Sequence, residues 1–213
     1  MADNKPFLMA CGFGVISFVL CLIGFGTGYW FVSADDTNLF ESIGLWQVCF
    51  NGYEHTSDLV GKAYYGCWWI FYKEYYYIRN WLMPPWFKAV QTLMTLAVVL
   101  QFIFLPLLFI ATADAKTKML KILCTINAFI ASLITTSVVI FGVMVGLDRT
   151  WVPRWDQDEL GWSYGLAVLS GFFSWFSLIC LCVYTTMRSY ELENKEKKPF
   201  VQSAPSGKRT PQV

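Results

Sequence analysis

Four long apolar runs dominate the pattern of hydrophobic and polar positions along this chain. They cover residues 7–32, 87–113, 122–147 and 161–187. Each run exceeds the roughly 20 residues that an α-helix needs to cross the hydrocarbon core of a bilayer. Because lipid offers no hydrogen-bond partners, a spanning backbone must satisfy its own N–H and C=O groups, as a helix does. The pattern therefore predicts an all-α transmembrane four-helix bundle.

Positive charges are unevenly distributed among the segments that connect these runs. The connection between the second and third runs is net basic, and so is the segment 188–213. The loops 33–85 and 148–160 are net acidic. Since lysine and arginine accumulate on the cytoplasmic side of membranes, we expect both termini in the cytoplasm and both acidic loops outside. The polar, proline-containing segment 188–213 is predicted to be a disordered cytoplasmic tail.

Composition narrows the classes of function. The chain is 56% hydrophobic and 15% charged, whereas soluble domains carry about a quarter charged residues. A net charge of +1 without a concentrated basic stripe argues against a nucleic-acid partner. With one histidine and no acidic residue inside an apolar run, no catalytic constellation or proton relay is visible. We therefore expect neither an enzyme nor a cofactor.

The loop 33–85 is rich in aromatic residues, which favour the pleated surface of a sheet. We predict strands at 43–50, 63–71 and 75–81, with turns at Asn51-Gly52 and Val60-Gly61. The loop 148–160 is short enough to add at most one edge strand. The prediction is a small extracellular antiparallel β-sheet above the bundle.

Cys49 and Cys67 are the two cysteines that fall in an outward loop. In the oxidising space outside a cell, a disulfide is their natural pairing. Two free thiols and a metal site are the alternatives. A metal site would want further ligands, and His55 is the only histidine in the chain, so none is expected.

Two features near the C-terminus suggest modification or a scaffold partner. Cys180 and Cys182 lie at the inner end of the fourth run, where cysteines are candidates for palmitoylation, although ordinary buried cysteines are the alternative. The chain ends in Thr210-Pro211-Gln212-Val213, an apolar terminus of the kind that PDZ domains capture. Pro211 lacks the N–H that strand addition uses, so the case for a PDZ scaffold is weak.

A set of motif residues, combined with the four apolar runs, resembles the claudin superfamily: Trp30, Gly44, Leu45, Trp46, Cys49 and Cys67. The resemblance covers residues 7 to about 187 and suggests one domain, 1–187. The aromatic stretch 66–79 is similar to that of insect claudin-like proteins of septate junctions. Two departures stand out: the 50–66 gap between the cysteines is long, and Gln91 lies about where many claudins carry an arginine.

The resemblance implies a left-handed bundle capped by an antiparallel sheet, with Trp46 low in the sheet and Cys49–Cys67 joining adjacent strands. It implies partners in the same and in the neighbouring membrane: further copies, other claudin-like or junction proteins, and the lipid bilayer. The leading hypothesis is a plasma-membrane protein of lateral cell–cell junctions that helps form or organise a paracellular barrier of the septate type. A regulatory or trafficking subunit of a channel or receptor, and a paracellular cation-selective pore, are the alternatives.

Overall fold

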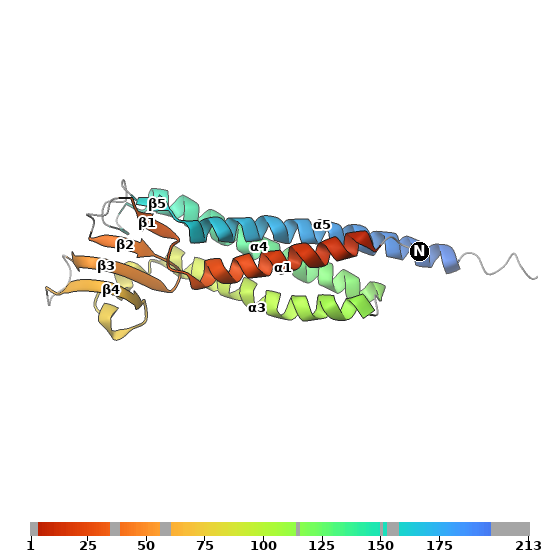
Figure 1. The fold of residues 1–213 in the computed structure, drawn as a ribbon, viewed down its shortest axis with the longest axis horizontal. Helices are drawn as coiled ribbons and strands as arrows, with labels where there is room; N and C mark the ends of the chain where they lie inside the picture. The colour runs from red at the N-terminus through yellow and green to blue at the C-terminus, as the bar shows by residue number, and fades with distance from the viewer. Residues whose placement is uncertain are drawn as a thin grey trace, which may run out of the picture.

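The computed structural model describes residues 4–34, 39–55, 61–113, 116–149, 151–152 and 158–196. Four long helices lie side by side, and a small sheet covers one end of the bundle (Figure 1). The helices are α1 (Lys5–Gly26), α3 (Pro85–Ala113), α4 (Thr117–Leu147) and α5 (Trp162–Glu196). Each is long and apolar enough to cross a membrane, which confirms the predicted four-helix architecture.

The C-terminal ends of the predicted first and last helices both need correction. The first run, 7–32, leaves the helix at Gly26, and its last residues enter β1 (Phe31–Ser33). Apolar residues suit a buried strand as well as a helix, so hydropathy could not locate this change. At the other end, α5 continues to Glu196, so the first part of the predicted disordered tail is helical. Residues 197–213 lie outside the described part of the chain.

The sheet has five antiparallel strands in the order β4-β3-β2-β1-β5. Besides β1, they are β2 (Phe40–Ile43), β3 (Gln47–Glu54), β4 (Ala63–Trp69) and β5 (Asp158–Leu160). The single edge strand expected from the second loop is β5, which pairs with β1. One sheet thus joins both loops that emerge from the same end of the bundle.

The predicted strand 43–50 is interrupted, because β2 ends at Ile43 and β3 begins at Gln47. Asn51-Gly52 is also not a turn. It lies within β3, where the register with β4 shifts, and Gly52 has a φ of +82°. Such a β-bulge admits one extra residue without ending the strand. Of the second predicted turn, Val60 lies outside the described residues.

The predicted strand 75–81 is wrong, since this segment is helical. It forms η1 (Lys73–Tyr75) and α2 (Arg79–Leu82). The buried side chains are Tyr75, Ile78 and Leu82, and this spacing of three and four residues is that of a helix. Burial of one helical face therefore outweighed the strand preference of the aromatic residues.

Polar residues inside the bundle bond between helices. Gln101 donates from Nε2 to the Ser17 hydroxyl at 3.1 Å, and Ser17 donates to the Ser170 carbonyl at 2.8 Å. Ser174 donates to Oδ1 of Asn127 at 3.3 Å. These contacts join α1 to α3 and α5, and α4 to α5, away from the ends of the helices.

Helices α1 and α5 approach each other closely at Gly24. A Cβ on Gly24 would lie 2.9 Å from the Ser163 carbonyl oxygen and 3.2 Å from the Ala167 nitrogen, both backbone atoms that cannot move aside locally. A Cβ on Gly12, in the same helix, would meet nothing within 4 Å. Small residues at such crossings let membrane helices pack closely.

Gly24→Ala is therefore expected to destabilise the bundle by about 1–3 kcal/mol, the usual cost of overpacking. Gly12→Ala is the matched control and should leave stability unchanged or slightly raised, because alanine favours helix. Thermal unfolding of the detergent-solubilised protein measures both. Equal melting temperatures for the two variants would contradict the close packing described at Gly24.

Candidate functional site

Trp30 fastens the sheet to the bundle. It lies between α1 and β1, fully buried, and not at the end of the first helix as the motif suggested. Its indole N–H donates to the Gly24 carbonyl at 2.6 Å, while its backbone N–H donates to Ile43 at 3.0 Å. Its own carbonyl accepts the Gly161 N–H at 2.9 Å. One residue thus joins α1, β2 and the start of α5.

The Gly44-Leu45-Trp46 step is the connection between β2 and β3, and it lies directly on the chain leaving α1. A Cβ on Gly44 would overlap the Thr27 carbonyl oxygen and the Gly28 backbone, so only glycine fits there. Leu45 is fully buried. The motif glycine is therefore explained by close approach of two backbones.

Gln91 holds this connection to α3. Its Nε2 donates to the Leu45 carbonyl at 2.6 Å, and the side chain is buried. This is the position where the family's arginine was not evident. The glutamine supplies a donor to the motif backbone without placing a charge in the buried site.

Trp46 lies at the boundary between the sheet and the helices. Its ring is half-buried and packs 5.4 Å from Phe25, in the last turn of α1. On its other side it contacts Phe71 at 6.3 Å and Trp69 at 6.5 Å. This low position in the sheet agrees with the one implied by the resemblance.

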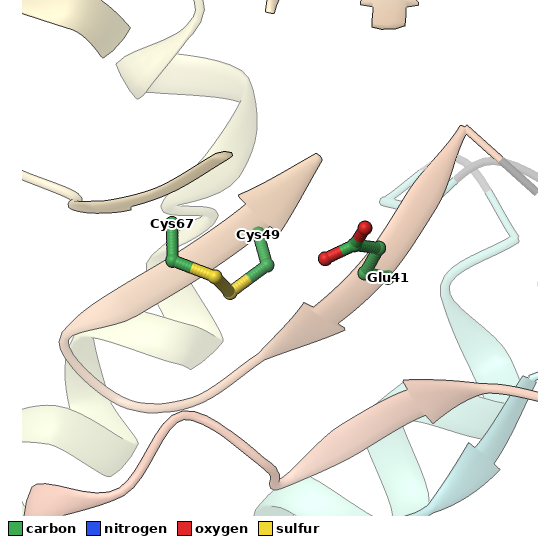
Figure 2. Close-up of side chains that lie close together, drawn as sticks. All are labelled: Glu41, Cys49 and Cys67. Carbon is green, nitrogen blue, oxygen red and sulfur yellow. A yellow bond between two sulfur atoms is a disulfide. The ribbon is translucent and has the colours of Figure 1, made fainter. Parts of the chain in front are cut away.

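Cys49 and Cys67 face each other across β3 and β4 and form a disulfide, with Cα atoms 4.0 Å apart. Figure 2 shows the Glu41 carboxylate turned toward this bond. Ligand atoms of these three residues lie within 4.8 Å of one another. Because a thiolate, and not a disulfide sulfur, is the metal ligand that cysteine offers, this cluster does not suit a metal ion.

Tyr75 supports the sheet from the helical segment η1. Its hydroxyl donates to the Val48 carbonyl at 2.9 Å and lies 3.3 Å from the Gly66 carbonyl. Its ring is edge-on to Phe50 at 5.7 Å. Burial is the main cause that raises the pKa of Tyr75 above its usual value, so the neutral hydroxyl is the form that the fold stabilises.

Arg79 fixes the turn that follows β4. Its Nε donates to the Ile70 carbonyl at 3.2 Å, and its Nη2 donates to the carbonyls of Phe71 and Tyr72 at 2.9 and 3.1 Å. The same cation lies 5.8 Å from the centre of the Tyr76 ring. Sequence reasoning missed both Tyr75 and Arg79, although the helical spacing of Tyr75, Ile78 and Leu82 was a signal for this segment.

The turn and β4 display a row of solvent-exposed aromatic side chains, here called the aromatic edge. Their exposed fractions run from 40% to 66%, and the residues are Tyr65, Trp68, Trp69, Phe71, Tyr72, Tyr76 and Tyr77. β4 is also the outermost strand of the sheet, so one of its edges has no neighbouring strand among the described residues. Exposed apolar patches and open strand edges are both features of interaction surfaces.

The other predicted residues lie away from this surface. Cys180 and Cys182 are free thiols on α5, the first half-buried and the second exposed. His55 directly follows β3, and its ring lies 4.5 Å from the Trp81 ring in a tilted arrangement, with the Tyr53 hydroxyl 3.1 Å from its Nδ1. The C-terminal Thr210-Pro211-Gln212-Val213 lies outside the described residues.

Replacing Cys49 by serine should remove about 3 kcal/mol of stability, the typical effect of a disulfide that closes a loop of this size. Thermal unfolding and protease resistance of the sheet measure the loss. Cys182→Ser, at an exposed free thiol, is the control and should match the wild type. Unchanged stability of Cys49→Ser would show that side-chain packing holds β3 and β4 together without the disulfide.

Tyr75→Phe should cost about 1 kcal/mol, because it removes one buried hydrogen bond and keeps the ring. Tyr76→Phe changes a neighbouring hydroxyl on a ring that is 66% exposed and should have no effect. The two variants are compared by thermal unfolding under the same conditions. If they melt together, Tyr75 does not support the sheet through its hydroxyl.

Comparison with known families agrees with this geometry. The profile of the family described as PMP-22/EMP/MP20/Claudin tight junction matches residues 15–183, well over half of the 213-residue chain. No curated protein matches the chain significantly. The match covers α3, α4, the sheet and the disulfide in full, and parts of α1 and α5. The chain therefore belongs to the PMP-22/EMP/MP20/Claudin family and is a membrane protein of the tight-junction type.

Proposed function

We propose that this protein is a structural component of lateral cell–cell junctions that helps form a paracellular barrier of the septate type. The observation that carries the proposal is the aromatic edge. The sheet that displays it is cross-linked by the Cys49–Cys67 disulfide and is hydrogen-bonded to the helices through Trp30. A barrier needs rigid surfaces that associate side by side and across the intercellular gap. The aromatic edge offers such a surface, and aromatic side chains are enriched at protein interfaces.

The proposal includes an orientation with the sheet outside the cell and both termini in the cytoplasm. The lysines Lys116, Lys118 and Lys121 and the residue Arg188 lie near the helix ends opposite the sheet. Such residues accumulate on the cytoplasmic side. The Cys49–Cys67 disulfide belongs to an oxidising compartment, which supports the same orientation.

The charges around the turn after β4 favour a seal over a cation pore. Lys62 pairs with Glu74 at 2.6 Å, so these two charges neutralise each other between β4 and η1. Arg79 adds a positive charge to the same turn, where its donors are bound to backbone carbonyls. Glu41 is the exposed acid beside the disulfide. A cation path would need a continuous acidic lining, and this mixture of signs does not provide one.

The aromatic edge also suggests which partners this protein binds. Further copies of the chain and other junction proteins are proposed to bind the aromatic edge within one membrane and across the gap.

The exposed thiol of Cys182, on the spanning helix α5, is proposed as the better placed of the two palmitoylation candidates, since Cys180 is half-buried.

In a polarised epithelium, the tagged full-length protein should concentrate at lateral cell contacts, and its depletion should raise tracer leakage. Replacing both Trp69 and Tyr76 by serine should lower co-purification of differently tagged copies by about tenfold, because buried aromatic residues dominate interface energies. Tyr190→Ser is the control, since Tyr190 is 64% exposed on α5 at the opposite end of the molecule.

Two results would overturn the proposal. One is an even distribution over the cell surface, with leakage unchanged on depletion. The other is co-purification of one stoichiometric channel in place of further copies, which would favour a channel subunit. Folding of each variant is checked by its disulfide and its melting temperature.

A further inference from the structure

An open groove of about 400 Å³ lies where the sheet meets the outer surface of α3. Trp46 and Phe71 form its wall on the sheet side, and Lys88, Thr92, Thr95 and Leu96 come from one face of α3. Their spacing of four, three and one residues places these α3 side chains along one stripe of the helix. The groove is therefore continuous with a helix surface that is long and apolar enough to face lipid.

The groove changes from polar to apolar along the helix axis. Lys88 lies in the first turn of α3, and Leu96 lies eight residues further, about 12 Å along the axis at 1.5 Å per residue. Between them, Thr92 donates its hydroxyl to the Lys88 carbonyl at 2.8 Å, and Thr95 to the Gln91 carbonyl at 2.6 Å. Because these hydroxyls are already bonded to their own helix, the middle of the groove demands no polar partner.

Positive charge lies at the sheet end of the groove. Lys88 is exposed, and no carboxylate among the described residues forms an ion pair with it. Nε1 of Trp46 is buried and has no acceptor among the described residues. The N-terminus of α3, which begins at Pro85, adds partial positive charge beside Lys88. An occupant with an anionic head would suit Lys88 and this helix terminus.

We propose that this groove holds one phospholipid from the leaflet nearest the sheet. Its phosphate is bound by Lys88, and one acyl chain follows Thr92, Thr95 and Leu96 toward the middle of the membrane. The charge of Lys88 complements a phosphate, and the polar-to-apolar direction is that of a lipid lying parallel to a spanning helix. An apolar helix of a second copy would leave the charge of Lys88 without an anionic partner.

The bound lipid would contact several parts of the chain that meet at this groove. Trp46 follows the Gly44-Leu45 step, and Phe71 belongs to the turn of the aromatic edge. Met83 lies just after α2, and the remaining lining comes from α3. The lipid would therefore add a contact between the aromatic edge and the membrane. This role does not depend on whether the protein seals or conducts.

The test uses the full-length protein in phosphatidylcholine vesicles that contain a phosphatidylglycerol with a diazirine in its acyl chain. A diacylglycerol with the same chain serves as the probe without phosphate. Photolabelling mapped by peptide mass spectrometry should concentrate on residues 88–96, more strongly for the phosphatidylglycerol. Lys88→Gln should reduce that preference by about fivefold, the effect of one lysine near a membrane surface.

Thr92→Trp should fill the groove and lower labelling by both probes several-fold. Thr112→Trp is the matched control, because Thr112 is also exposed on α3 with its hydroxyl bonded to its own helix. Equal labelling of the Thr92→Trp and Thr112→Trp variants, or an unchanged probe preference in Lys88→Gln, would overturn the proposal. Labelling that falls as protein density in the vesicles rises would also overturn it, since a second copy would then occupy the groove.

Discussion

Everything at the sheet end of this molecule depends on the way Trp30 uses its hydrogen-bonding groups. The indole N–H, the backbone N–H and the backbone carbonyl each bond to a different segment: Gly24 of α1, Ile43 of β2, and Gly161 before α5. The ring is buried against Phe141 at 4.9 Å and Tyr164 at 5.7 Å. Near the membrane such groups are costly to leave unpaired, so this arrangement fixes the sheet relative to three helices.

Because the sheet is held firmly to the helices, its aromatic edge can stay exposed to solvent. Gln91 secures the Leu45 carbonyl, Tyr75 supports β3, and Arg79 binds three carbonyls of the turn after β4. Exposed aromatic side chains would otherwise collapse onto one another or into the core. Here the backbone that carries them is held from behind, so the aromatic edge is presented as a defined surface.

Sequence reasoning succeeded where a single physical requirement governs the pattern. A span must be apolar over its whole length, which identified all four helices, and two cysteines in one loop identified the disulfide that joins β3 and β4. It failed where two structures accept the same residues. Apolar residues after Gly26 fit helix or strand, and the aromatic residues near Tyr75 fit a strand until burial selects one helical face. Asn51-Gly52 is typical of a turn, yet it forms a bulge because β3 continues beyond it.

By itself, the sequence determined that this chain spans a membrane four times and carries a small sheet with a disulfide, because hydropathy and cysteine placement act locally along the chain. It also pointed to the claudin superfamily through Trp30, the Gly44-Leu45-Trp46 step and the two cysteines. Only the tertiary structure decided why those motif residues are needed. Gly44 meets the backbone leaving α1, and Trp30 is buried in the core beneath the sheet. These contacts join residues far apart in the chain, and such long-range packing leaves no periodic signal in the sequence.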